Sequence, residues 1–518
     1  MNSVFVTFIL KIFSTLNYWY EYSLIHKMME KLFGIFKSSV ICNTIAKERN
    51  YWQSGSLKFL SFMWLAPLFT FLDNLFKTSI FFKISATVLN YIKTVILNSS
   101  ISRVLLWFVN VHVSHAKPLF LVFSGFVIFM ALVPSHFWSN LFILAGAALL
   151  GIIFIFQIFT KKIKFEREFI PPSIVVFVLF ALISLITGFG GADSFRVGSI
   201  MFASVAISVI SIYVLNSIHR FRLFIGFVLV ALVLTAIYGI FQFVMGIEIR
   251  LDFIDLEANQ GMGGRLFATM GNPNNYAKFI TMFLPFVVAL FFVVKGAFKK
   301  TLLLGAIGLI IAVLLLTLSR ASYLAIAGSV GVFILFMKPR LVPIAVAVGL
   351  LSVPFWPDFV MARLSTLGTD SSSVFRMWIW EGSLRMLENY FITGVGMGPS
   401  AFRTIYLEYS HQLAGSAMHS HNVFLNVWLE LGIGGFIAIV LYNFIAIKKS
   451  IIAFFKTDNF ELKLYLAAAL SSIAAFLAFA MVEHVWFYPR TMLVYFITMG
   501  MTFALIRLEK KVNIGGSK

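Results

Sequence analysis

Long, predominantly apolar runs recur along this 518-residue sequence, and they constrain its fold more than any other feature. The hydrocarbon core of a bilayer is about 30 Å thick, so a helix that crosses it needs about 20 mostly apolar residues. We therefore expect an all-α, polytopic integral membrane protein with about 12 transmembrane helices. The expected spans are 119–133, 139–159, 170–187, 199–215, 223–245, 276–294, 301–318, 322–336, 341–355, 423–447, 462–481 and 491–506.

The overall composition agrees with a membrane protein and excludes an ordinary soluble domain. Hydrophobic residues make up 60% of the chain and charged residues only 12%, and the mean hydropathy is +0.94. Soluble domains are about half apolar and about a quarter charged. The single cysteine, Cys42, excludes an intrachain disulfide and a cysteine-rich metal site.

The net charge of +20 indicates the orientation of the chain rather than a nucleic-acid partner. The longer segments on one side of the predicted bundle, 246–275 and 356–422, have net charges of −2 and −1, whereas six short loops on the other side are basic. Cytoplasmic loops collect Lys and Arg, so we expect a protein of the inner (cytoplasmic) membrane with both termini in the cytoplasm. The basic charge is thereby explained, and we expect no bound nucleic acid. The basic loops are 161–168, 220–222, 295–300, 338–340, 448–463 and 507–518.

Residues 1–118 form a separate basic region, with twelve Lys or Arg against four Asp or Glu. Its apolar runs are short, and its basic residues are interleaved with Trp, Tyr and Phe, a pattern typical of helices held at the membrane surface by anionic lipid head groups. We interpret it as a cytoplasmic membrane-surface extension. The alternatives are a tilted or re-entrant span at 59–72 and a scaffold for cytoplasmic partners. The transmembrane domain then covers 119–508, and 509–518 is a cytoplasmic tail.

The two outer segments, 246–275 and 356–422, are too long to be simple turns, and long loops in a compact architecture usually carry function. The first contains a glycine-rich stretch at 260–265. The second contains apolar residues at helical spacing, which predicts an amphipathic helix on the outer surface of the bundle, ended by the glycine-rich segment 393–399. The apolar residues are Met377, Trp380, Leu384, Leu387 and Phe391.

Three arginines lie beside predicted spans on the outer side. Arg320 lies in a turn between two apolar runs, where an arginine is costly unless it faces water, a cavity or an anion; the alternative is a side chain that snorkels to the interface. Arg265 follows two glycines and precedes the segment 271–274, so it can form an anion-binding corner or simply accompany a loop-to-helix entry. Arg376 opens the amphipathic helix and can equally be an exposed surface charge.

Two histidines, His419 and His421, lie where the second outer segment meets the apolar run that begins at Val423. Histidine exchanges protons near neutral pH, so the pair can supply a general base or orient an acceptor. No cysteine or carboxylate cluster joins the pair, so we predict no metal. In the alternative interpretation Asn422 caps the following helix, and the histidines are interfacial residues. The last outer loop supplies further supporting candidates, namely Glu483, His484 and Arg490.

Four motifs follow one another in a fixed order along the outer side of the predicted bundle. They are Gly264-Arg265-Leu266-Phe267 through Asn272-Pro273-Asn274, Leu318-Ser319-Arg320-Ala321, Arg376 with Trp378 or Trp380 leading into Gly394-Val395-Gly396-Met397-Gly398, and His421-Asn422 followed by Glu430-Leu431-Gly432-Ile433-Gly434-Gly435. In this order the chain resembles the O-antigen ligase superfamily, which includes O-antigen ligases and related polymerases of bacterial surface polysaccharides. The resemblance covers about residues 119–508.

The resemblance implies a membrane glycosyltransferase that transfers an undecaprenyl-diphosphate-linked oligosaccharide or polysaccharide to an acceptor glycan or glycolipid, without nucleotide, metal or other cofactor. It further implies that Arg265, Arg320 and Arg376 bind the diphosphate, the latter two as catalytic residues. His421, which directly precedes Asn422, would assist the acceptor hydroxyl, although His419 is also available for this role. The remaining candidate substrate-binding residues are His419, Asn422 and Arg490.

The acceptor and the reaction class remain open at the level of sequence. A lipid A core as acceptor would make the protein a ligase, and another lipid-linked chain would make it a polymerase. A secondary transporter of an anion, with arginines along its path, is the alternative from another class. The two halves of the sequence show no repeat and the arginines cluster outside rather than at mid-depth, so the enzyme is favoured.

Overall fold

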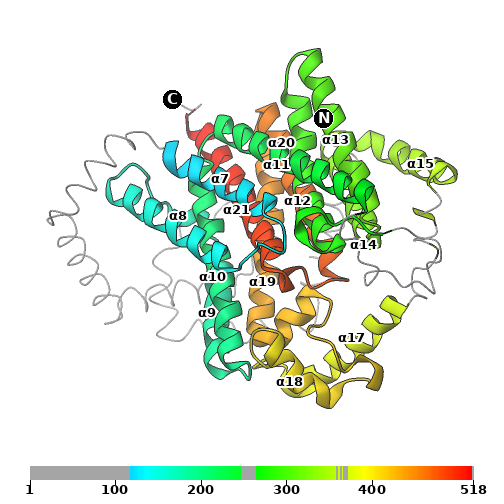
Figure 1. The fold of residues 1–518 in the computed structure, drawn as a ribbon. Coiled ribbons are helices and arrows are strands. Elements are labelled where there is room, and N and C mark those ends of the chain that lie inside the picture. Colours follow the sequence, from blue (N-terminus) through cyan, green and yellow to red (C-terminus); the bar gives the residue numbers. More distant parts are fainter. Residues whose placement is uncertain (1–116, 247–263, 358–359, 362–364, 366–370, 516–518) are drawn as a thin grey trace, which may run out of the picture. The chain divides into compact units, whose positions relative to one another are not determined.

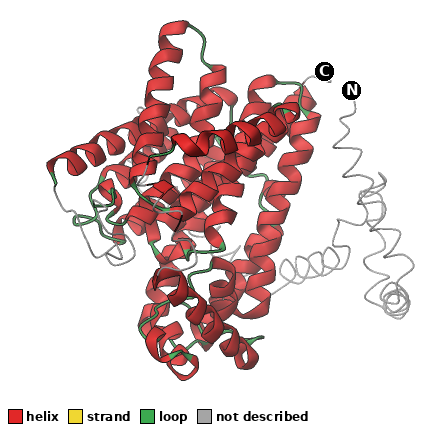
Figure 2. Ribbon diagram, turned by 90° about the vertical axis from the view of Figure 1, so that its right-hand side faces the viewer, coloured by secondary structure: helices red, strands yellow, loops and turns green. Residues whose placement is uncertain are grey.

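The structure, a computed structural model, describes residues 117–246, 264–357, 360–361, 365 and 371–515 (Figure 1). These residues form helices and their connections, with no strand among them (Figure 2). The predicted all-α fold is therefore confirmed. The predicted membrane-surface extension lies outside the described residues, except for its last two, and so does most of the glycine-rich stretch at 260–265.

Each of the twelve predicted spans coincides with a helix. Three of these helical segments are apolar but short, namely α7 (Lys117–Leu132), α9 (Pro172–Thr187) and the segment Pro339–Phe355. Within the described ranges, nine helices are long and apolar enough to cross a membrane. The nine are α8 (Leu141–Phe159), α10 (Gly191–Val214), α11 (Ile218–Met245), α12 (Pro273–Val293), α13 (Ala297–Leu316), α14 (Arg320–Met337), α19 (Val423–Lys456), α20 (Phe460–Ala480) and α21 (Pro489–Gly515).

The predicted span at 341–355 differs most from a regular transmembrane helix. It consists of the 11-residue helix α15 (Val342–Ser352) between two short 3-10 helices, and none of the residues of α15 is buried. Prolines 339, 343 and 354 explain the interruption, because proline donates no backbone hydrogen bond and favours the first turn of a helix. Helix α15 lies at the edge of the bundle (Figure 1).

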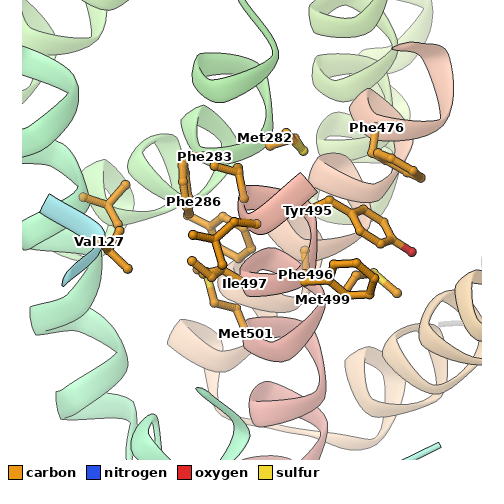
Figure 3. Close-up of a cluster of buried hydrophobic side chains, with 14 of the residues drawn as sticks. Val127, Met282, Phe283, Phe286, Phe476, Tyr495, Phe496, Ile497, Met499 and Met501 are labelled. Atoms are coloured by element: carbon orange, nitrogen blue, oxygen red, sulfur yellow. The ribbon is translucent and has the colours of Figure 1, made fainter. Parts of the chain in front are cut away.

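The most buried part of the bundle is formed by α12, α20 and α21. Small side chains allow close packing here, as in the fully buried run 467–469, which consists of three alanines. The hydroxyl of Ser472 on α20 donates a hydrogen bond of 2.6 Å to the backbone oxygen of Met282 on α12. Figure 3 shows aromatic and aliphatic side chains of this core, including Phe283 of α12 and Ile497 of α21.

Two further helices, α17 (Ser371–Tyr390) and α18 (Pro399–Tyr409), lie at one end of the bundle, away from the C-terminal end of α21 (Figure 1). We call this the site end, and the other the opposite end. The two helices share a second hydrophobic core with the start of α19, built from side chains such as Ile379, Phe402 and Leu429. The predicted helix in the second long segment is therefore present as α17.

The buried face of α17 differs from the predicted apolar row. Its buried residues are centred on Ile379 and Met386, and Leu387 is the member of the predicted row that is buried. Met377 and Leu384 are 61% and 57% exposed. An apolar side chain near a membrane can pack inward or point away from the core, so spacing alone does not distinguish the two faces.

A backbone connection that we call the glycine strap, residues 394–398, joins α17 to α18 and crosses α19. Helix α19 is kinked at Gly432, where φ is +69°. The strap fits into the kink: the amide of Val395 donates to the carbonyl of Leu429 over 2.6 Å, and a β-carbon at Gly432 would lie 1.9 Å from the carbonyl oxygen of Ile392. Only glycine permits both this conformation and this contact. The glycines of the third and fourth motifs therefore hold the site end together.

Candidate functional site

The candidate site is built around Glu483, in the turn between α20 and α21 at the site end. One carboxylate oxygen lies 2.5 Å from the guanidinium of Arg376 on α17, and the other lies 3.6 Å from the ammonium of Lys278 on α12. The side-chain amide of Asn274 donates to Glu483 over 3.3 Å. A single buried carboxylate thus connects side chains of α12 and α17 that are about 100 positions apart in the sequence.

Glu483 is held in its charged form. Burial opposes the charge, but the nearby cations of Lys278 and Arg376 outweigh it and lower the pKa of Glu483 below its ordinary value. Lys278 is completely buried, and Arg376 is 22% exposed. Two basic side chains thus face one carboxylate, and basic groups outnumber acidic groups in the cluster.

His421 lies beside this cluster, with its Nδ1 atom 3.9 Å from the second oxygen of Glu483. Its φ of +50° is unusual for a residue other than glycine. Its backbone amide donates to Nδ1 of His419 over 3.1 Å, which supports this turn. Burial, together with the charges of Arg376 and Lys278, lowers the pKa of His421 to about 4 against the opposing effect of Glu483. The imidazole is therefore neutral at pH 7 and able to accept a proton.

His419 packs among aromatic rings rather than on the carboxylate. Its ring lies 4.1 Å from that of His421, 4.3 Å from Phe487 and 5.4 Å from His484, measured between centroids. Burial, together with the neighbouring histidines, lowers the pKa of His419 well below its ordinary value. Burial also lowers the pKa of His484 to about 3. The three histidines thus form a neutral layer next to the charged cluster.

Arg265 reaches the cluster through Asn274. Its guanidinium donates to the side-chain oxygen of Asn274 over 2.8 Å and to the backbone oxygen of Thr317 over 2.9 Å. The hydrogen bond to Thr317 places Arg265 beside the turn between α13 and α14, in which Leu318 has a φ of +50°. Arg320 follows this turn as the first residue of α14. Arg265, Arg376 and His421 are thus linked through Glu483, and Arg320 begins its helix next to the anchor of Arg265.

The other two predicted residues have clear structural contacts. Asn422 is the N-cap of α19: its side-chain oxygen accepts from the amide of Leu425, and its side-chain nitrogen donates to the backbone oxygen of Met481, each over 3.0 Å. Arg490 is buried, donates to the backbone oxygen of Thr269 over 3.0 Å and lies 3.9 Å from the ring centre of Trp138. The alternative interpretation of Asn422 as a cap is thereby confirmed, and its role in substrate binding stays a prediction, as does that of Arg490.

Several buried polar atoms around the cluster have no hydrogen-bond partner in the part of the chain that the structure describes. Buried polar groups are usually paired, so these atoms remain available for a hydrogen bond to a polar ligand or water. No group of three or more His, Cys, Asp and Glu among the described residues has the arrangement of a metal site. The atoms are Ser319 Oγ, Arg376 Nε, His421 Nδ1, His484 Nδ1 and Arg490 Nη2.

Sequence reasoning missed Lys278 and Asn274 and ranked Glu483 too low. Lys278 lies inside a predicted span, and an ionisable residue within such a run is by default a candidate for function, so this signal was available. Asn274 carried no such signal, because the segment around it is also a good helix start. Asn272 indeed caps α12, accepting from the amides of Asn274 and Asn275.

A comparison with protein families covers three of the four sequence motifs, those at 318–321, 376–398 and 421–435. The family described as O-antigen ligase matches residues 304–440. The match contains Arg320, Arg376 and His421, whereas Arg265 and Glu483 lie outside it. No curated protein sequence matches the chain. The match to residues 304–440 supports the resemblance of the chain to the O-antigen ligase superfamily.

Proposed function

We propose that this protein is a membrane glycosyltransferase that transfers a glycan from a polyprenyl-diphosphate-linked donor, such as undecaprenyl diphosphate, to an acceptor hydroxyl. The observation that carries the proposal is the convergence of Arg376, Lys278 and His421 on Glu483. Two of these residues, Arg376 and His421, lie within the part of the chain that matches the O-antigen ligase family. Cations that stabilise a leaving diphosphate and a neutral base that accepts the proton of the acceptor are the two requirements of this reaction.

In the proposed reaction the acceptor oxygen attacks the anomeric carbon of the donor. The bond between that carbon and the diphosphate oxygen breaks, and the electron pair leaves with the lipid diphosphate. Arg376, Arg320 and Arg265 stabilise the growing negative charge, because guanidinium groups bind phosphate oxygens in pairs. His421 takes the proton of the acceptor hydroxyl. Glu483 positions Arg376 and His421, and none of these steps calls for a metal or another cofactor.

The same proposal includes the membrane topology. All twelve predicted helical segments would cross the membrane, with the bilayer locally thinned around the three shorter ones. The basic loops at the opposite end would lie in the cytoplasm with both termini, so the site end would face outward from the inner membrane. The family match concerns ligases and gives no support to the transport of an anion.

The acceptor distinguishes two forms of the reaction. Transfer to a lipid A core glycan would be ligation, and transfer to another lipid-linked chain would be polymerisation. The residues that select the acceptor would lie in the large outer segment that contains α17 and α18. Offering both acceptors to the purified protein with one donor separates the two.

The role of His421 as base predicts an unusual pH dependence. Its pKa of about 4 lies below that of an ordinary histidine, so kcat/KM is expected to stay constant from pH 8 to about pH 5.5 and to fall only as the pH approaches about 4. Removing a neighbouring cation in Arg376→Gln should raise this pKa and move the acid limb of the profile to higher pH.

Stability has to be measured alongside this profile. The buried histidines have depressed pKa values, so the unfolded state binds more protons below about pH 6.5 and the fold loses stability as the pH falls. Melting temperatures at each pH separate this effect from loss of the base. A profile that falls through pH 6.5 in a fully folded protein would contradict the assignment.

A further inference from the structure

An open groove of about 600 Å³ lies at the opposite end of the bundle, far from the candidate site along the helices. Its walls come from the end of α12, the turn into α13 and the start of α20. Apolar side chains form one part of the lining and charged side chains the other. The residues that matter here are Phe292, Val293, Phe460, Lys295, Lys300 and Glu461.

The groove has an excess of positive charge. Glu461, the acidic residue in its lining, is engaged by Arg222, whose Nε lies 2.8 Å from one carboxylate oxygen and whose Nη2 lies 2.5 Å from the other. Arg222, Lys295 and Lys300 therefore contribute three positive charges against the one negative charge of Glu461. Arg222 pairs with both oxygens of Glu461, and the ion pairs of the described residues include none between Glu461 and Lys295 or Lys300. The groove therefore favours an anion.

The apolar part of the lining is also accessible. Phe292 is 50% exposed and Phe460 is 60% exposed, and the ammonium of Lys300 lies 5.5 Å from the ring centre of Phe291. A small soluble anion would use the lysines but leave these aromatic walls uncovered. A ligand with both an anionic and an apolar part fits the groove best.

We propose that this groove binds an anionic phospholipid of the cytoplasmic leaflet, with the phosphate at Lys295 and Lys300 and acyl carbons against Phe292 and Phe460. Basic residues at the inner membrane surface attract anionic head groups, and exposed aromatic side chains suit the boundary between head group and acyl chain. The proposal goes beyond glycan transfer and rests only on the proposed orientation of the chain. Transfer activity and lipid binding can therefore fail independently.

Native mass spectrometry of the full-length protein, titrated with phosphatidylglycerol or phosphatidylcholine, tests the proposal. The unmodified protein is expected to retain phosphatidylglycerol in preference to phosphatidylcholine. The double variant Lys295→Gln/Lys300→Gln should bind phosphatidylglycerol about 25-fold more weakly, since two favourable charges are lost. The variant Phe460→Ala should also weaken phosphatidylglycerol binding.

A matched control removes two charges from another loop at the same end. Lys338 and Arg340 are exposed and lie outside the groove, so Lys338→Gln/Arg340→Gln should change phosphatidylglycerol affinity by no more than about twofold. An equal loss in both double variants would show diffuse attraction and overturn the proposal. So would equal binding of inorganic phosphate and phosphatidylglycerol, or full binding by the Lys295→Gln/Lys300→Gln variant.

Discussion

Replacing His421 with asparagine is expected to reduce glycan transfer by about 10²- to 10⁴-fold, the range typical of a lost general base. Asparagine is chosen because, like histidine here, it tolerates a positive φ, so the turn before α19 is retained. The loss should appear in kcat, since the imidazole takes the proton during the chemical step, when the acceptor hydroxyl attacks. The measurement is the initial rate of transfer by purified protein whose melting temperature is unchanged.

Two further histidine variants sharpen this result. His219→Asn, at an exposed position near the start of α11, should leave the rate within about twofold of the unmodified protein. His419→Asn should reduce the rate of transfer less than His421→Asn does. Nδ1 of His419 accepts a hydrogen bond from the amide of His421 and its ring packs against Phe487, so its role is to support the turn. A larger loss for His419→Asn than for His421→Asn would make His419 the base and would contradict the assignment.

Replacing Arg376 with alanine is expected to reduce kcat by about 10²- to 10³-fold, as for other lost groups that stabilise charge in a transition state. Arg376 lies 2.5 Å from Glu483 and at the edge of the buried cluster, so it can reach both the carboxylate and a bound diphosphate. Arg376→Lys should recover part of the activity, since it restores the charge without the planar fork.

The matched control for this variant lies on the same helix. Arg385 also forms an ion pair on α17, with Glu381 at 3.2 Å, but its side chain is 47% exposed. Exposed pairs contribute little to stability, so Arg385→Ala should leave transfer within about twofold. If Arg376→Ala kept full activity, or if both variants lost activity equally, the proposed role of Arg376 would be wrong.

The helices of the described region could be predicted from the sequence, because a bilayer selects long apolar runs regardless of tertiary contacts. Every expected span coincides with a helix, although proline shortens the one around α15. Sequence alone could not show which face of α17 is buried. Met377 and Leu384 are as apolar as Met386 and Leu387, yet only the latter pair packs against α18 and α19.

The residues of the candidate site could be predicted in part. The alternation of basic and neutral loops assigned Arg265, Arg320, Arg376 and His421 to one end of the bundle. This works because consecutive helices that cross a membrane place alternate loops on the same side. The central position of Glu483 could not be predicted, because it depends on contacts with α12 and α17 that lie far away in sequence. Neither could the glycine strap, which arises from close backbone contacts.

The most direct test of the account is transfer by the purified protein, reconstituted in proteoliposomes with a polyprenyl-diphosphate-linked glycan and an acceptor. The measurement follows three quantities together: glycan joined to the acceptor, lipid diphosphate released, and donor or anion taken up into the vesicle lumen. The account predicts equal amounts of transferred glycan and released lipid diphosphate, with no uptake. Uptake of an anion without any transfer would contradict it and would favour a transporter.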